Sequence, residues 1–242
     1  MTLIAAIRSV VTYLAVLLYI AVAGPLGLII AIVFKWKRGL YALGHAGVQL
    51  GLSLAGIRYR VTGRDRVPPA AVIFCSNHES NVDPPILFRA LHPQLHILYK
   101  AELHKFPIMG TVFDVGGFVP IERGNRERAM KSIGSGAESL RAGNSFLIFP
   151  EGTRSRTGDL LPFKKGGFIM AIEAQAPIVP VAVQGGRAAM RKGSTIVRPV
   201  HVSVRIGEAI PTAGLTLDDR DVLIERVRGA IRGLLDQGPL WT

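Results

Sequence analysis

One short segment combines the side chains that a proton-transfer site needs. Asn77-His78-Glu79-Ser80-Asn81-Val82-Asp83 follows an apolar run that ends at Ser76. His78 and Asp83 are five residues apart, so a turn, rather than a regular helix or strand, would bring them together. A carboxylate that holds a histidine ring makes it a better base, able to take a proton from a hydroxyl group. Alternatively, Asp83 caps a helix that begins at Pro84-Pro85, and His78 is a surface loop residue.

A second polar segment, Phe149-Pro150-Glu151-Gly152-Thr153-Arg154-Ser155, also follows an apolar run. Gly152 would let the backbone approach a ligand closely, and the hydroxyl groups beside it can form hydrogen bonds. Arg154 carries a planar guanidinium group that matches the oxygens of a phosphate. The composition favours an anion site, although Glu151 and Arg154 could instead pair within a polar turn.

Two further segments are weak signals on their own. Gly116-Gly117-Phe118-Val119-Pro120-Ile121-Glu122-Arg123 is a glycine turn followed by a short strand with an arginine at its end. Most arginines in such places are simply solvated. Ile178-Val179-Pro180-Val181 is an apolar run whose proline cannot donate a ladder hydrogen bond, which is typical of a structural role.

The elements that must position these segments alternate along the chain. One helical face repeats at Met130, Ile133, Ala137 and Leu140; another repeats from Leu223 to Leu234, after a capping-box pattern at Thr216 and Asp219. Strands alternating with helices predict an α/β fold with a mostly parallel central sheet flanked by helices. Such sheets place their sites beyond the strand ends. Buried strands are predicted at residues 71–76, 118–121, 145–149, 178–183 and 200–206.

In this order and spacing, the four segments together resemble the glycerolipid acyltransferase family, particularly its 1-acylglycerol-3-phosphate (lysophosphatidate) O-acyltransferases. The resemblance covers about residues 35–210 and has no departure at the central motif positions. It implies transfer of a fatty acyl group from an acyl thioester to the sn-2 hydroxyl of lysophosphatidic acid, giving phosphatidic acid for phospholipid biosynthesis. The donor would be acyl-CoA or acyl-carrier protein. A lysophospholipid or a lyso-ornithine lipid is the alternative acceptor.

The resemblance also assigns roles to residues. His78 would be the general base and Asp83 its orienting partner. No cofactor and no metal are implied. A covalent acyl-enzyme on Cys75, Ser76 or Ser80 is the less favoured route, since a thiol in an apolar run is usually inert. The phosphate of the acceptor would be bound by Lys100, Arg123, Glu151, Gly152, Thr153 and Arg154.

The N-terminal region has the composition of a membrane element. Residues 9–34 carry no charge, and a straight helix of that length would exceed a hydrocarbon core of roughly 30 Å. Because Gly24-Pro25-Leu26-Gly27 interrupts this tract, it could be a kinked span or a two-helix hairpin. Lys35-Trp36-Lys37-Arg38 then predicts a cytoplasmic flank at the inner (cytoplasmic) membrane. A signal peptide cleaved near Ala21-Val22-Ala23 is the disfavoured alternative. The predicted division is a membrane-anchoring segment at 1–38 and an acyltransferase domain at 39–242.

The formal net charge of +12 over 242 residues indicates an anionic partner such as membrane lipid. Residues 35–60 hold five basic residues and no acidic one, and residues 121–170 hold nine against five. Nucleic-acid binding is disfavoured because aromatic residues are only 7% and do not alternate with the basic clusters. A metal-dependent phosphoesterase is disfavoured because the histidines are scattered. A non-enzymatic, membrane-anchored protein that binds anionic lipid would leave the His78–Asp83 pair without a task.

Overall fold

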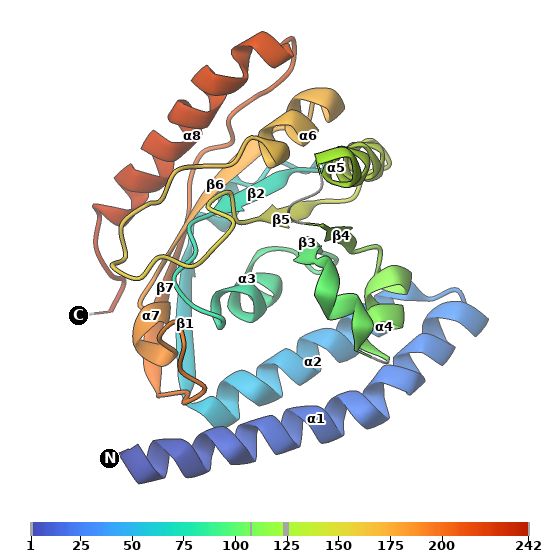
Figure 1. Cartoon of the computed structure of the whole chain (residues 1–242), viewed down its shortest axis with the longest axis vertical. Coiled ribbons are helices and arrows are strands. Elements are labelled where there is room, and N and C mark those ends of the chain that lie inside the picture. Colours follow the sequence, from blue (N-terminus) through green and yellow to red (C-terminus); the bar gives the residue numbers. More distant parts are fainter. Residues whose placement is uncertain (1, 107, 123–125, 242) are drawn as a thin grey trace.

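A sheet of seven strands forms the centre of the computed structural model, which describes residues 2–106, 108–122 and 126–241 (Figure 1). The spatial order is β1-β7-β6-β2-β5-β3-β4. Strands β6 and β7 are antiparallel, and the other neighbouring pairs are parallel. The predicted mostly parallel α/β sheet is therefore confirmed. The strands are β1 (Ile57–Thr62), β2 (Ile73–Ser76), β3 (His96–Lys100), β4 (Val119–Ile121), β5 (Phe146–Ile148), β6 (Ile178–Gln184) and β7 (Val200–Ile206).

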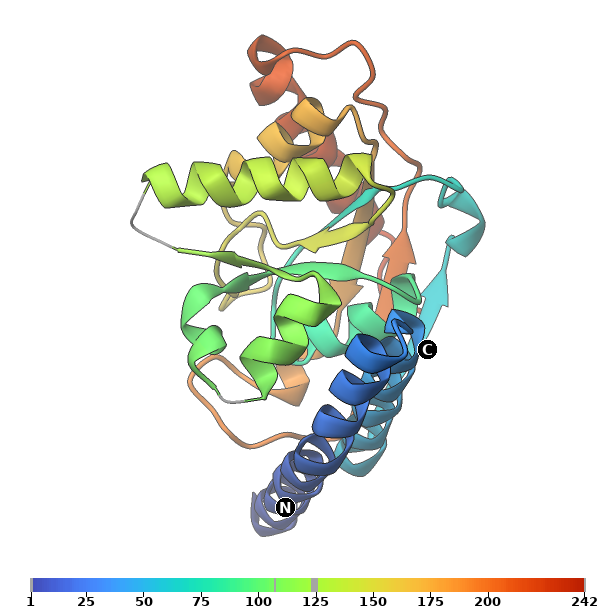
Figure 2. The same cartoon turned by 90° about the vertical axis from the view of Figure 1, so that its right-hand side faces the viewer.

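Helices cover both faces of the sheet, and the pleat of the strands divides the core between them. In β2, Phe74 packs with the cluster under α2 and α3, whereas Ile73 and Cys75 pack with the cluster under the helices of the opposite face. Figures 1 and 2 show these two helical layers. The first layer holds α2 (Lys37–Ala55), α3 (Asp83–Leu91) and α4 (Met109–Gly116), and the second holds α5 (Arg126–Arg141), α6 (Gly166–Ala174) and α8 (Arg220–Leu235).

Four short helical turns complete the connections: η1 (Arg64–Arg66), η2 (Ala101–Lys105), α7 (Gly186–Ala189) and η3 (Leu217–Asp219). The predicted capping box lies at η3, directly before α8. Oδ2 of Asp219 accepts hydrogen bonds from the backbone N–H of Thr216 at 2.8 Å and from its hydroxyl at 3.0 Å. The cap satisfies polar backbone groups where the chain enters the last helix.

The apolar N-terminal tract is a single helix, α1 (Thr2–Val33), which continues through Pro25. The predicted alternative of two short helices that separate at Gly24–Gly27 is therefore wrong. Instead, α1 packs antiparallel against α2, after a turn near residue 35 (Figure 1). A side chain at Gly27 would lie 2.7 Å from Leu40 Cδ1, so glycine permits this close approach of the two helices. The Tyr19 hydroxyl donates to the Leu43 carbonyl at 2.8 Å and ties them together.

Helix α1 lies along the α/β unit. Near its start, the backbone N–H of Val197 donates to the Ser9 hydroxyl at 2.8 Å. Near its end, Gly24 packs against Ile108, the residue before α4. Its outer side is exposed and apolar, and it includes Leu14, Leu17, Leu18 and Val22. Among the described residues, α1 is the helix long and apolar enough to cross a membrane.

Candidate active site

The motif residues follow the carboxyl ends of parallel strands. Strands β6, β2, β5, β3 and β4 are neighbours that run in the same direction, so their carboxyl ends meet at one edge of the sheet. His78 follows β2, Glu151 follows β5, and Lys100 is the last residue of β3. This edge is where an open α/β sheet places its ligand site.

His78 and Asp83 come together in a tight turn between β2 and α3. Nδ1 of His78 lies 3.0 Å from Oδ2 of Asp83, which is fully buried. The same oxygen accepts the backbone N–H groups of Glu79 and Ser80, both at 2.7 Å. No side-chain cap is present at the start of α3, so the carboxylate of Asp83 holds the turn and the ring instead of capping the helix. The predicted pair is formed.

The two nitrogens of the His78 ring have different surroundings. Its side chain is 15% exposed, and its face stacks on Phe149 with 4.2 Å between ring centroids. Within the described part of the chain, Nε2 has no hydrogen-bond partner. With one nitrogen fixed on a carboxylate and the other accessible, the ring has the arrangement of a general base.

Glu151 holds the second motif against the first. Oε1 accepts the backbone N–H of His78 at 2.9 Å, and Oε2 accepts that of Leu161 at 3.1 Å. The backbone N–H of Ser155 donates to the carbonyl of His78 at 2.8 Å. Burial raises the pKa of Glu151, and these backbone hydrogen bonds partly offset the rise. Both carboxylate oxygens are engaged and repel anions, so this geometry favours positioning of His78 over the predicted direct contact with phosphate.

The 152–154 loop lies between Glu151 and Ser155, the two residues that form hydrogen bonds with the His78 backbone. It consists of Gly152, Thr153 and Arg154. Gly152 has φ of +65°, a conformation that favours glycine. The Thr153 hydroxyl accepts a hydrogen bond from Lys192 Nζ at 3.0 Å. The guanidinium group of Arg154 has no hydrogen-bond or ion-pair partner among the described residues. A free guanidinium group and a positively charged lysine beside a glycine turn form a candidate phosphate site.

The other two predicted phosphate residues have different outcomes. Lys100 lies at the same sheet edge, but its ammonium group pairs with Glu102 at 3.0 Å, and both side chains are about half exposed. Among the described residues, no hydrogen bond or ion pair joins Lys100 to the 152–154 loop. Arg123 lies outside the described residues.

Two buried polar residues of the first motif hold the turn in place. Asn77 exchanges two hydrogen bonds of 2.8 Å with the backbone of Val183, which joins the turn to β6. The Ser80 hydroxyl donates to the Met190 carbonyl at 2.9 Å. The sequence did not predict these hydrogen bonds because both partners lie more than a hundred residues away. These contacts fix the turn to the sheet on the side of α7.

Glu79 is a further residue that the motif did not single out. It is buried, and its carboxylate lies near the backbone N–H groups of Gly185 and Arg187 at the start of α7. Burial first, and then the negative charge of Asp83, raise its pKa to about 7, against the lowering effect of those backbone N–H groups and of the Arg187 charge. The only sequence signal was a carboxyl group inside the motif.

The residues considered for a covalent intermediate are buried and engaged. Cys75 is fully buried, and burial raises the pKa of its thiol far above the ordinary value. The Ser76 hydroxyl donates to the carbonyl of Asn77 at 3.0 Å, and that of Ser80 is occupied as described above. These positions do not favour a nucleophile in contact with His78.

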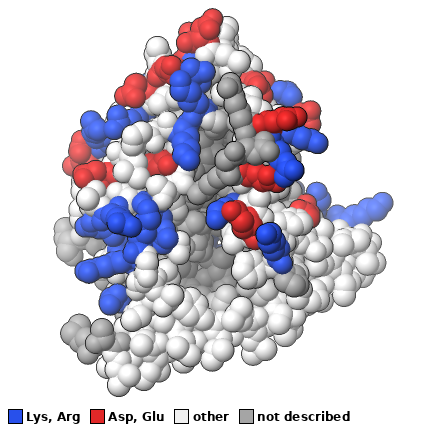
Figure 3. All heavy atoms as spheres, in the orientation of Figure 1, with Lys and Arg blue, Asp and Glu red and all other residues white. Residues whose placement is uncertain are grey.

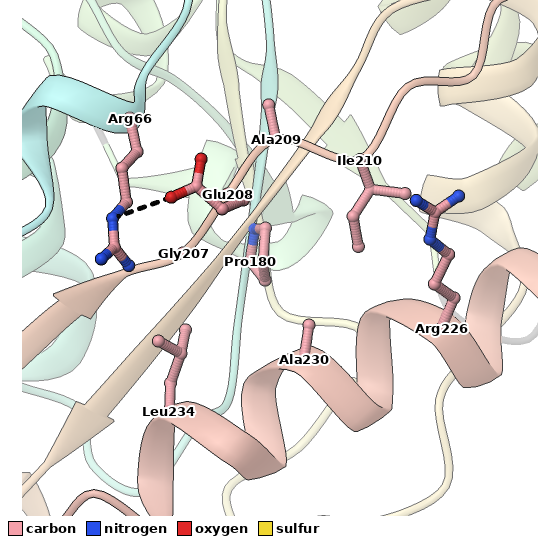
Figure 4. Close-up of a pocket in the computed structure, with 9 residues that line it drawn as sticks. All are labelled: Arg66, Pro180, Gly207, Glu208, Ala209, Ile210, Arg226, Ala230 and Leu234. Atoms are coloured by element: carbon pink, nitrogen blue, oxygen red, sulfur yellow. Dashed lines mark ion pairs between the residues drawn. The ribbon is translucent and has the colours of Figure 1, made fainter.

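A hollow of about 350 Å³ lies apart from the motif turns, between β6, α8 and the end of β7 (Figure 4). Arg66 and Glu208, which line it, pair with each other at 3.1 Å. Pro180 of the Val-Pro segment also lines it, but His78 and Arg154 do not. The chemistry predicted from the motifs therefore belongs to the sheet edge and not to this hollow. Within the described residues, no three His, Cys, Asp or Glu side chains are grouped as a metal site would require.

Comparison with known proteins agrees with this arrangement. The acyltransferase family model matches residues 58–184, more than half of the chain. The chain therefore belongs to the acyltransferase family. Within it, the predicted similarity to the 1-acylglycerol-3-phosphate O-acyltransferases is confirmed by named relatives.

A 1-acyl-sn-glycerol-3-phosphate acyltransferase of Limnanthes douglasii is 32% identical over 218 residues, covering 88% of this chain and 76% of the plant protein. The 1-acyl-sn-glycerol-3-phosphate acyltransferase beta of Homo sapiens is 35% identical over 179 residues, covering 73% of this chain and 64% of the human protein. The crystal structure of the 1-acyl-sn-glycerophosphate acyltransferase PlsC from Thermotoga maritima has a TM-score of 0.87 at 23% identity over the full length of both chains, so the two share a fold.

Proposed function

We propose that this chain transfers a fatty acyl group from an acyl thioester to the sn-2 hydroxyl of 1-acylglycerol-3-phosphate, producing phosphatidic acid. The observation that carries the proposal is the His78 ring, held by the Asp83 carboxylate at 3.0 Å, beside the 152–154 loop, where the guanidinium group of Arg154 has no partner among the described residues. The names of the relatives point to the same acceptor. The donor is the thioester of coenzyme A or of an acyl-carrier protein.

The proposed mechanism begins with proton removal. When Nδ1 of His78 carries its proton toward Asp83, Nε2 has a free lone pair for the proton of the acceptor hydroxyl. The hydroxyl oxygen attacks the thioester carbonyl as that proton moves, and a new C–O bond forms. The buried carboxylate of Asp83 stabilises the positive imidazolium that results.

Collapse of the tetrahedral intermediate breaks the C–S bond. The sulfur leaves with the bonding electron pair, and the imidazolium of His78 can return the proton to it as a thiol. The ring is then neutral again, so the cycle needs no external acid or base. Binding the acceptor's phosphate at Thr153 and Arg154 would fix the distance from that group to the reacting hydroxyl.

The proposal includes a place at a membrane. Helix α1 rests on the α/β unit at Ser9 and at Gly24, while its outer side is exposed and apolar. The lower part of the face in Figure 3, where α1 lies, carries little charge. We therefore infer that α1 lies within one leaflet, parallel to the membrane surface, with the active site at the headgroup level on the cytoplasmic side of the inner membrane.

The deciding experiment uses the purified full-length chain with labelled acyl-CoA and acyl-carrier protein and a panel of lysolipid acceptors. We expect labelled phosphatidic acid from lysophosphatidic acid. The His78→Ala variant should lose acyl transfer while it retains its thermal unfolding temperature and its binding to anionic vesicles. His201→Ala, at an exposed histidine in β7, is the matched control and should keep full activity.

Other outcomes would redirect the proposal. Transfer to a lysophospholipid or a lyso-ornithine lipid in place of lysophosphatidic acid would retain the chemistry and change the acceptor. Vesicle binding without transfer to any acceptor would favour the non-enzymatic lipid-binding alternative. Full activity in His78→Ala would refute the mechanism.

A further inference from the structure

Two lysines outside the motif residues contact the 152–154 loop. Lys192, in the connection from α7 to β7, donates through Nζ to the Thr153 hydroxyl at 3.0 Å and to the Arg154 carbonyl at 3.1 Å. The ammonium group of Lys164 lies against Gly152, where an added Cβ atom would be 2.9 Å from Nζ. The backbone N–H of Lys164 also donates to the Pro150 carbonyl at 2.8 Å.

The positive charges at this loop have no acidic partners in the part of the chain that the structure describes. Among the described residues, neither Arg154, Lys164 nor Lys192 forms an ion pair with a carboxylate. In contrast, Lys165, next to Lys164, pairs with Asp221 at 3.3 Å. Figure 3 shows lysine and arginine side chains gathered on this face of the molecule. Like charges held close together repel one another unless an anion lies among them.

We propose that Lys164 and Lys192 complete the acceptor's phosphate site with Arg154 and make it selective for a phosphate monoester, an inference that rests on the proposed function. A monoester carries about −1.5 to −2 charges at neutral pH and three terminal oxygens, as phosphoserine does. A phosphodiester headgroup has a single charge and two terminal oxygens. Three cations from three separate segments suit the monoester better.

The position of these lysines relative to His78 supports the assignment. Glu151 and Ser155 both form hydrogen bonds with the backbone of His78. Because consecutive Cα atoms are about 3.8 Å apart, the Cα of Thr153 lies within about 8 Å of the Cα atoms of Glu151 and Ser155. In 1-acylglycerol-3-phosphate, four covalent bonds separate the sn-2 oxygen from the phosphorus. A phosphate bound at Thr153 would therefore leave the hydroxyl within reach of the His78 ring.

Lys192 retains a hydrogen-bond donor for a ligand. Its ammonium group has three donors, and two of them are used on Thr153 and Arg154. The third remains for an oxygen of the ligand. The two internal bonds would then orient the charge before the acceptor binds, which lowers the entropy cost of binding.

The test compares Lys192→Met and Lys164→Met with Lys165→Met, which removes the same charge from the Asp221 pair. Initial rates are measured with lysophosphatidic acid and with lysophosphatidylglycerol in the same mixed micelles, and sn-glycerol 3-phosphate serves as a competitive inhibitor. A lost charge-assisted hydrogen bond predicts that each site variant raises the KM for lysophosphatidic acid and the Ki of glycerol 3-phosphate by roughly tenfold. We expect kcat/KM for the phosphodiester to change less than twofold, and Lys192→Arg to recover most of the affinity. Lys165→Met should resemble the wild type.

The outcomes separate this inference from the proposed function. If the wild type produces phosphatidic acid but the site variants keep the wild-type KM and Ki, the inference fails and the proposed function stands. If Lys192→Met lowers kcat equally for both acceptors without a change in KM, Lys192 is a tether and the inference also fails. If the wild type transfers no acyl group to lysophosphatidic acid, glycerol 3-phosphate binding is measured directly by calorimetry. Loss of that binding in the variants would support the anion site without the proposed function, whereas unchanged binding would overturn both.

Discussion

Replacement of Gly186 by alanine should damage the proposed catalytic pair from outside the motif. Gly186 is the first residue of α7, and a Cβ atom built there overlaps Oδ1 of Asp83. That oxygen is buried and has no hydrogen-bond partner among the described residues, while Oδ2 accepts from the turn and lies against the His78 ring. The carboxylate cannot rotate away without breaking those contacts. The Gly186→Ala variant must therefore displace Asp83 or α7.

The size of the effect follows from the geometry. Relief of the overlap requires a displacement of roughly 1 Å, and a displacement of that size at a catalytic group can cost about 10²-fold in rate. Weakening of the two backbone hydrogen bonds to a charged carboxylate should also cost stability, at about 1.5–3 kcal/mol for each bond lost. We expect kcat to fall about a hundredfold, KM for the acceptor to change little, and the thermal unfolding temperature to drop by several degrees.

The assay pairs acyl transfer with thermal unfolding, and Gly134→Ala and Gly229→Ala are the matched controls. Both control glycines lie inside helices, and an added Cβ atom would have nothing within 4 Å. Alanine at such positions should keep activity and raise stability by about 0.5–1 kcal/mol. Wild-type kcat in Gly186→Ala would show that the close contact does not fix Asp83, and this reasoning would be wrong.

Two substitutions and one labelling experiment test other buried groups. The folded-state pKa of Glu79 is about 7, above its ordinary value of 4.5. Its contribution to the unfolding free energy is therefore complete below pH 4.5 and is lost as the pH rises through 7. The loss is on the order of 3 kcal/mol. Glu79→Gln should therefore reduce the loss of unfolding free energy between pH 5.5 and pH 8.5, and an unchanged pH profile would contradict this. Glu151→Gln places an amide donor against a backbone donor, and should lower kcat for all acceptors; selective loss of acceptor affinity would instead favour direct phosphate contact. Cys75 should react with N-ethylmaleimide only after unfolding, as mass spectrometry can measure, since its thiol is buried and its pKa raised.

The sequence predicted five of the seven strands and missed β1 and β3, which lack a clear apolar run. Strand β2 is buried along its whole length, as expected for a central strand. Strand β1 lies at the sheet edge and alternates buried Ile57 with exposed Arg58, so it formed no apolar run. Strand β3 contains His96 and ends at exposed Lys100, which concealed it in the same way.

Within the candidate site, the local pair was predictable and the distant supports were not. His78 and Asp83 are five residues apart, so a single turn brings them together. Asn77 and Ser80 bond to backbone groups beyond residue 180, and Lys192 reaches Thr153 across 39 positions. Single-sequence patterns carry no information about such pairings, because only the order of strands in the sheet creates them. The same holds for α1, whose packing on α2 involves Gly27, a glycine that the sequence analysis treated as part of a break.

The contacts around His78 imply that anchors and cations should affect the reaction differently. The residue that is proposed to take the proton also holds the phosphate loop, since its backbone N–H donates to Glu151 and its carbonyl accepts from Ser155. A change in an anchor such as Glu151 moves the loop and the ring together, so it should alter kcat for every acceptor. A change in Lys192 removes charge while those anchors remain, so it should alter affinity for phosphate alone. The split between kcat and KM therefore separates residues that position the base from residues that bind the substrate.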